Sequence, residues 1–138
     1  VYLETNGYYP KRIEKVASQI SYACVDIKDR SAKCVKNSEW EKLVQKELDS
    51  LSILNNYAAK AFAKLVVTAD TLVEDVRMIA DKLREIVMPI VIQPVTPIGK
   101  VKAISNEKLF EITEVIAEVL PTDLFGISIQ GHKLLNML

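Results

Sequence analysis

The chain alternates between two patterns of hydrophobic residues, one typical of strands and one of helices. Strand-like patterns occur at residues 1–3, 22–27, 59–67, 88–92 and 125–129. The run at 22–27 is of the kind expected of a strand covered on both faces, whereas residues 59–67 alternate, with Lys60, Phe62 and Lys64 separated by small residues. Between these runs, apolar residues return every three or four positions, which predicts helices that begin near Pro10, Ser38, Thr71, and Ser105 or Asn106. Strict alternation of strand and helix predicts an α/β fold with a parallel sheet and right-handed crossovers.

Two helix starts carry the sequence pattern of a capping box. Ser38 is followed three residues later by Glu41, and Thr71 by Glu74. In such a box the hydroxyl accepts a hydrogen bond from the backbone of the first helical turn, and the acidic side chain bonds back. We therefore expect Ser38 and Thr71 to cap their helices.

Composition narrows the class of protein. With 138 residues and about half of them apolar, the chain can build one core, so residues 1–138 are taken as one domain. Its 18 basic and 18 acidic residues balance, and no basic cluster stands apart, which argues against nucleic acid as a partner. The longest apolar run is far shorter than a membrane span, and no leader pattern opens the chain, so a cytoplasmic protein without a membrane contact is expected.

The two cysteines do not suggest a metal site. Cys24 lies within an apolar run, and Cys34 follows ten residues later, which matches no common zinc spacing. A cytoplasmic location also disfavours a disulfide. The chain opens without Met and within a strand-like pattern, so we expect that an upstream portion precedes it in the parent protein.

Polar residues follow four of the five predicted strands. They are Glu4 and Asn6 after the first strand, Asp26 and Lys28 after the second, Gln93 and Thr96 around the end of the fourth, and Gln130 and His132 after the fifth. The carboxyl ends of parallel strands meet at one edge of a sheet, where α/β enzymes bind their ligands.

Each of these residues also has a purely structural interpretation. Glu4 could cap a turn, Asp26 and Lys28 could form a pair that seals the sheet, and His132 could be an ordinary exposed histidine. Gln93 is harder to explain in that way, because an amide that ends an apolar run is costly unless something hydrogen-bonds to it.

Four strings carry a resemblance to a known family. In order along the chain, they are LETNG at residues 3–7, VDIK at 25–28, IQPVTP at 92–97 and HKLL at 132–135. Together they resemble the second half of radical S-adenosylmethionine enzymes, and most of all the 7-carboxy-7-deazaguanine synthase group, once placed among the organic radical activating enzymes. The resemblance implies the C-terminal half of a partial (β/α) barrel that begins at its third strand.

The resemblance also implies a chemistry. Enzymes of that group use a [4Fe–4S] cluster, S-adenosylmethionine and Mg²⁺ to convert the pterin-like substrate 6-carboxytetrahydropterin to 7-carboxy-7-deazaguanine, a lyase reaction in deazapurine biosynthesis for tRNA modification. Their cluster motif CxxxCxxC and Gly-Gly-Glu stretch lie before the point where this chain starts. By position, the resemblance implies that Glu4 and Asn6 lie near S-adenosylmethionine or the substrate, and that Asp26 and Lys28 lie on the ribose and carboxylate side of S-adenosylmethionine. Gln93, Thr96 and His132 are expected to bind the substrate.

No residue here is assigned a catalytic or metal-binding role. Two cysteines cannot supply the three thiolates that such a cluster needs, so this chain alone is expected to be inactive and to hold none of these cofactors. Two alternatives stay open: an activating enzyme for a glycyl-radical enzyme, and a non-catalytic small α/β binding domain. Neither GxGxxG nor GxxxxGK[ST] occurs, which excludes the usual dinucleotide and phosphate-binding loops.

The segment at residues 29–56 departs from the synthase pattern, because it is longer and more charged than expected for that group. We also expect a homo-oligomer, because the first strand leaves an unpaired edge.

Overall fold

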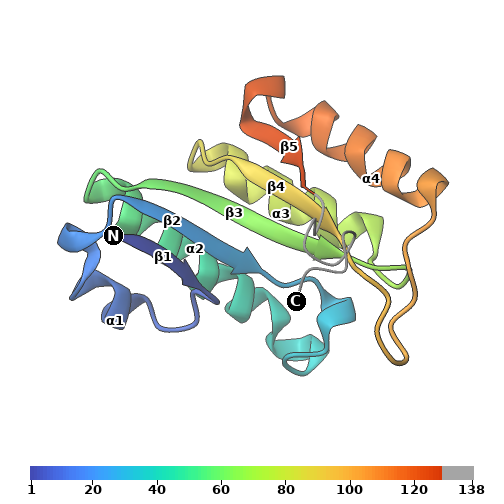
Figure 1. Cartoon of the computed structure of the whole chain (residues 1–138), viewed down its shortest axis with the longest axis horizontal. Helices are drawn as coiled ribbons and strands as arrows, with labels where there is room; N and C mark the ends of the chain where they lie inside the picture. Colours follow the sequence, from blue (N-terminus) through green and yellow to red (C-terminus); the bar gives the residue numbers. More distant parts are fainter. Residues whose placement is uncertain (129–138) are drawn as a thin grey trace.

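The structure, a computed structural model, describes residues 1–128 and contains one sheet of five parallel strands (Figure 1). The strands lie side by side in chain order. They are β1 (Tyr2–Thr5), β2 (Tyr22–Ile27), β3 (Lys60–Val67), β4 (Ile90–Pro94) and β5 (Phe125–Ile127). This arrangement confirms the predicted α/β fold class and is that of part of a (β/α) barrel.

Helices connect successive strands and pack on one face of the sheet. They are α1 (Pro10–Glu14), α2 (Trp40–Asn56), α3 (Val73–Glu85) and α4 (Asn106–Val119), with short 3₁₀ turns at Ala17–Gln19, Arg30–Ala32, Asn37–Glu39 and Thr122–Leu124. In Figure 1, α2 and α3 lie behind the sheet, and none of the helices within residues 1–128 lies over the opposite face. None of the described helices is both long and apolar enough to cross a membrane.

The hydrophobic core fills the space between the sheet and these helices. Alternate residues of each strand point into it, such as Val25 and Ile27 of β2, which are almost completely buried. Leu51 of α2 and Ile79 of α3 belong to the same buried cluster on the helical side. The intervening strand residues therefore point to the open face, and Glu4, Asp26 and Lys64 are among them.

The first predicted helix is shorter than its pattern suggested. α1 ends at Glu14, and a 3₁₀ turn at Ala17–Gln19 completes the connection. Ile13 and Ala17 are buried, but Val16 is 41% exposed. The apolar spacing was correct for the buried residues, but the connection back to β2 is made by a tighter turn.

Both predicted capping boxes are wrong. α2 begins directly after a 3₁₀ turn and is preceded by Glu39, with no side-chain cap from Ser38. Thr71 does not cap α3, because its hydroxyl accepts a hydrogen bond from the Thr68 N–H (2.9 Å) in the preceding turn. Ser105 does cap α4, accepting from the Lys108 N–H at 3.2 Å.

The fourth strand lies two residues later than predicted. Met88 belongs to the turn that follows α3, where its N–H donates to the Leu83 carbonyl (3.1 Å). Pro94 is the last residue of the strand rather than its terminator, because the next N–H, that of Val95, continues the pairing by donating to the Val67 carbonyl at 3.0 Å. β5 ends at Ile127, and residue 129 of the predicted strand lies outside the described residues.

Gly7 provides a test of the close contact between the β1–α1 turn and α2. Its φ is +63°, and a Cβ there would lie 2.8 Å from Val25 Cγ1 and 3.0 Å from Glu47 Cα. Gly7→Ala should lower the free energy of unfolding by about 2 to 4 kcal/mol, because backbone strain and overpacking add. Urea unfolding at pH 7 measures it.

Gly99→Ala is the matched control. Gly99 has nearly the same φ (+62°), but nothing lies within 4 Å of the place that a Cβ on it would occupy. Only the backbone strain applies, so the loss should be about 1 kcal/mol. Equal losses for the two variants would contradict the close packing of Gly7 on α2.

Candidate functional site

A row of charged side chains crosses the open face near the carboxyl ends of β1, β2 and β3. The Lys64 ammonium lies 2.5 Å from Glu4 Oε1 and 3.0 Å from Asp26 Oδ1. The Lys28 ammonium lies 3.0 Å from the other Asp26 oxygen. The structure therefore brings together three of the predicted site residues through Lys64, a residue that the sequence had not singled out.

Strand register explains this row. Asp26 and Lys64 are direct partners across β2 and β3, and Glu4 is paired with Cys24, two residues before Asp26. Burial alone would lower the pKa of Lys64, but its hydrogen bonds to Glu4 and Asp26 outweigh burial and raise that pKa above its ordinary value. Lys64 is therefore a permanent positive charge between two carboxylates. A lysine in the middle of a mostly buried strand was the signal available in the sequence.

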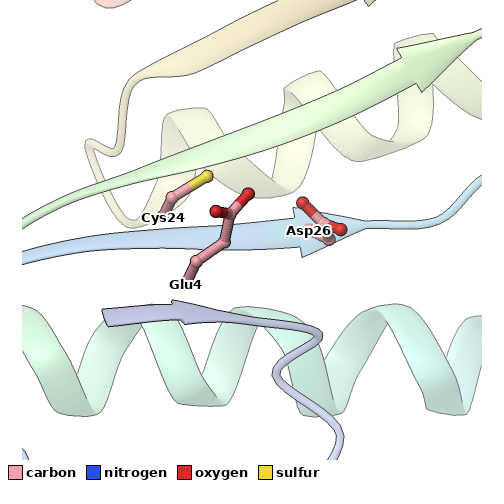
Figure 2. Close-up of side chains that lie close together, drawn as sticks. All are labelled: Glu4, Cys24 and Asp26. Carbon is pink, nitrogen blue, oxygen red and sulfur yellow. The ribbon is translucent and has the colours of Figure 1, made fainter. Parts of the chain in front are cut away.

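The carboxylates of this row come close to a thiol, as Figure 2 shows. The ligand atoms of Glu4, Cys24 and Asp26 all lie within 4.8 Å of one another. A metal ion would nevertheless have to displace Lys64, whose ammonium contacts both carboxylates. Burial also raises the pKa of the Cys24 thiol, and although Lys64 opposes this, both carboxylates add to it, so the thiolate form that binds metals is disfavoured. The residues favour a charge network over a metal site.

A cavity of about 580 Å³ lies beside this row, at the carboxyl ends of β2, β3 and β4. Its polar lining includes Lys28, Asp29, Ser31, Thr68, Asp70 and Lys100. This volume is in the range of small-molecule sites, and the position is the usual one in parallel α/β folds. We call this region the rim cavity.

Asp29 contributes a buried acceptor to the rim cavity. Its side chain is only 2% exposed, and Oδ2 has no hydrogen-bond partner among the described residues. The other oxygen accepts a hydrogen bond from the Ser31 hydroxyl at 2.9 Å. A buried carboxylate oxygen without a donor is costly, so a ligand hydroxyl or amine, or water, would satisfy it. Sequence reasoning placed Asp29 only at the start of a loop.

The loop that carries Asp29 is held in place by its neighbour Arg30. The Arg30 backbone N–H and guanidinium both donate to Asp75 of α3, at 3.1 and 2.7 Å. The guanidinium also lies 4.3 Å from the centre of the Trp40 ring, and the Trp40 indole donates to the Lys28 carbonyl at 2.7 Å. Burial raises the pKa of Asp75, although Arg30 opposes that effect. These contacts fix the backbone on both sides of Asp29.

The other predicted site residues are less closely grouped. The Asn6 side chain accepts a hydrogen bond from the Tyr8 N–H (3.2 Å) and lines a second cavity, of about 210 Å³. Gln93 is half-buried and pairs in register with Val66, so it points to the open face, and Thr96 follows it in a half-buried position. His132 and Gln130 lie outside the described residues. Whether Gln93 and His132 share a rim stays a prediction.

Glu47 of α2 is a functional candidate that sequence reasoning missed. Its side chain is completely buried, and one carboxylate oxygen accepts a hydrogen bond from the Lys28 N–H at 3.2 Å. Burial raises the pKa of Glu47 to about 8, although the Lys28 contacts oppose this. The sequence feature that could have identified Glu47 is the position of an acidic residue within the apolar stripe of the helix, between Val44 and Leu48.

Comparison with known proteins gives relatives of a single kind. The chain is 43% identical over 137 residues to the 7-carboxy-7-deazaguanine synthase of Thermococcus kodakarensis, and 39% identical over 139 residues to that of Methanocaldococcus jannaschii. Each alignment covers 99% of this chain but only 51% and 55% of the relative. The synthase of Methanothermobacter thermautotrophicus is 30% identical over 109 residues. No family model matches the chain.

The chain is thus similar, over nearly its whole length, to half of a 7-carboxy-7-deazaguanine synthase. It spans about half the length of the relatives that it matches. The expected likeness to this synthase group is confirmed at the level of sequence similarity.

Replacing Lys64 tests the charged row. Lys64→Met leaves Glu4 and Asp26 facing each other without their shared cation, so the free energy of unfolding should fall by about 1 to 3 kcal/mol at pH 7. Lys60→Met is the control, because Lys60 is exposed on the same face of β3, and within residues 1–128 its ammonium makes only a distant cation–π contact, with Tyr22 (5.7 Å). Urea unfolding measures both, and equal losses would show that the row contributes nothing.

The raised pKa of Glu47 predicts a pH-dependent stability. Between pH 4.5 and about 8 the unfolded chain has Glu47 ionised while the folded chain keeps it protonated, so stability falls as pH rises through this window. Glu47→Gln keeps an acceptor for the Lys28 N–H and removes this loss. Relative to the unsubstituted chain, the variant should gain on the order of 3 to 5 kcal/mol between pH 5 and pH 9. A constant difference across urea unfolding at these two pH values would refute the assignment.

Proposed function

We propose that this chain is the ligand-binding second half of a 7-carboxy-7-deazaguanine synthase of the radical S-adenosylmethionine type, which converts 6-carboxytetrahydropterin to 7-carboxy-7-deazaguanine. The main support is its similarity to three proteins named 7-carboxy-7-deazaguanine synthase, which covers 99% of the chain in two of them. These relatives favour a synthase over the activating enzyme and the non-catalytic domain. The five-stranded parallel sheet with its rim cavity is consistent with such a part.

The residues of this chain do not fit an iron–sulfur cluster. A cluster that keeps one iron open to S-adenosylmethionine needs three thiolates, and the chain has two cysteines. Cys24 is buried in β2, and Cys34 is exposed in the following loop. Any cluster must therefore be held by other parts of the complete enzyme. Glu4 and Asp26 likewise do not fit Mg²⁺, because the Lys64 ammonium contacts both.

The rim cavity does fit a polar organic ligand such as S-adenosylmethionine. Lys28 and Lys100 offer positive charge to a carboxylate, and the free oxygen of Asp29 offers an acceptor to a hydroxyl or amine. When bound, S-adenosylmethionine supplies the radical that removes a hydrogen from the substrate. In this proposal Lys28 and Asp29 bind and orient it.

The open face supplies groups that could align the substrate. Gln93 carries both donors and acceptors and lies in β4, near the end of the sheet that carries the charged row. Hydrogen abstraction needs alignment and exclusion of water more than a strong base, so a half-buried amide suits the task. Thr96 and His132 remain the predicted partners of Gln93 in binding the pterin.

Self-association also stays a prediction. β1 pairs only with β2 in the described sheet, so its other edge has backbone groups without a strand partner. Light scattering on the 138-residue chain would detect a dimer formed through this edge.

An activity assay on the complete protein that carries this chain tests the proposal. After anaerobic reconstitution with iron and sulfide, it should convert 6-carboxytetrahydropterin to 7-carboxy-7-deazaguanine in the presence of S-adenosylmethionine, measured by mass spectrometry. The 138-residue chain treated in the same way should stay colourless, because it lacks the thiolates. A complete protein that carries its cluster but forms no product would overturn the function.

Gln93→Ala tests the substrate site separately. Loss of one or two hydrogen bonds to the substrate should lower kcat/KM by about 10- to 100-fold in the complete protein. Lys60→Ala, at the far end of the neighbouring strand, should leave kcat/KM unchanged. Equal kcat/KM values for the Gln93→Ala variant and the unsubstituted enzyme would remove Gln93 from the site while leaving the proposed function intact.

A further inference from the structure

Glu47 lies beneath the rim, where it contacts two loops that carry predicted ligand-binding residues. We propose that Glu47 is a positioning residue, which works in its protonated form and joins the Lys28 segment to the Asn6–Gly7 turn. The inference rests on the proposed function only in taking the rim as a ligand site. The physical claim about Glu47 can be tested without any ligand.

The first contact holds the backbone of Lys28. Glu47 Oε2 accepts the Lys28 N–H at 3.2 Å, while the Trp40 indole donates to the Lys28 carbonyl at 2.7 Å. Both peptide groups of Lys28 are thus held by α2. Because the Lys28 side chain pairs with Asp26, any shift of this backbone is transmitted to the charged row.

The second contact holds the Asn6–Gly7 turn. Gly7 approaches α2 so closely that a Cβ on it would lie 3.0 Å from Glu47 Cα. One helical turn away, the Ser50 hydroxyl donates to the Gly7 carbonyl at 2.7 Å. Glu47 and Ser50 therefore form one buried face of α2 that supports Asn6 on one side and Lys28 on the other.

The remaining oxygen of Glu47 determines which charge state suits this place. Oε1 is buried and has no hydrogen-bond partner among the described residues. Glu47 borders the 210 Å³ cavity that Asn6 and Lys28 also line. If Glu47 were ionised, Oε1 would be a buried acceptor without a donor. If Glu47 is protonated, Oε1 carries the proton.

The surrounding charges agree with this assignment. Asp26 and Lys28, at the end of β2, are the charged groups that act on Glu47, and they act in opposite directions. Tyr8 and Cys34 are the other titratable residues that line the cavity. Burial is the largest influence, and it favours the protonated acid. Ionisation should therefore draw water or a cation into the cavity and displace the Lys28 segment.

Nuclear magnetic resonance of the 138-residue chain tests this coupling. Between pH 6 and pH 10, the Glu47 side-chain carboxyl carbon should titrate with a midpoint near 8, the value expected from its burial. The backbone amide signals of Lys28 and Gly7 should shift with the same midpoint. In Glu47→Gln, where the amide mimics the protonated acid, both amide signals should lose this transition.

Two control variants separate Glu47 from its neighbours. Glu41→Gln removes an exposed carboxylate from the same helix and should leave the transition unchanged. Cys34→Ser removes the thiol of the cavity and should also keep the midpoint. A Glu47 midpoint below 6, Lys28 and Gly7 signals that do not follow Glu47, or a transition that survives in Glu47→Gln would each overturn the inference. None of these outcomes depends on enzymatic activity, so the proposed function can fail independently.

Discussion

The ion pairs of Lys64 with Glu4 and Asp26 are the interaction on which the arrangement of the open face depends. In a parallel sheet, each strand places alternate side chains on the face away from the helices, and register decides which of them become neighbours. Here the register brings two carboxylates from β1 and β2 to one ammonium on β3. The half-buried lysine balances these carboxylates, and Lys28 extends the row to the end of β2.

The α2 helix supports this row from the opposite face. Trp40 and Glu47 hold the Lys28 backbone, and Ser50 holds the neighbouring turn through Gly7. These bonds use polar groups within an otherwise apolar helix face, where an unpaired group would be costly. A buried acid in such a place costs stability when it ionises. The presence of Glu47 at this position is explained if the two loops that it joins must keep a fixed geometry for a ligand.

Besides Asp26 Oδ1, which faces the Lys64 ammonium, two buried oxygens, Asp29 Oδ2 and Glu47 Oε1, have no hydrogen-bond partner among the described residues. Both lie next to cavities at the carboxyl ends of the strands. Unsatisfied buried acceptors are uncommon away from sites that bind something, so their position agrees with a ligand-binding rim. It also agrees with the similarity to 7-carboxy-7-deazaguanine synthases, which covers 99% of the chain.

The sequence by itself determined the order of strands and helices, a cap at Ser105 or Asn106, and the placement of Glu4, Asp26, Lys28 and Gln93 near strand ends. These features depend on local patterns, which a chain shows without being folded. Only the tertiary structure decided which residues meet. The role of Lys64 depends on the register of three strands, and that of Glu47 on how α2 packs beneath two loops. The capping boxes at Ser38 and Thr71 failed because a turn overrides the local preference for a cap. At Thr71 the turn uses the hydroxyl, and at Ser38 a 3₁₀ turn moves the start of the helix by one residue.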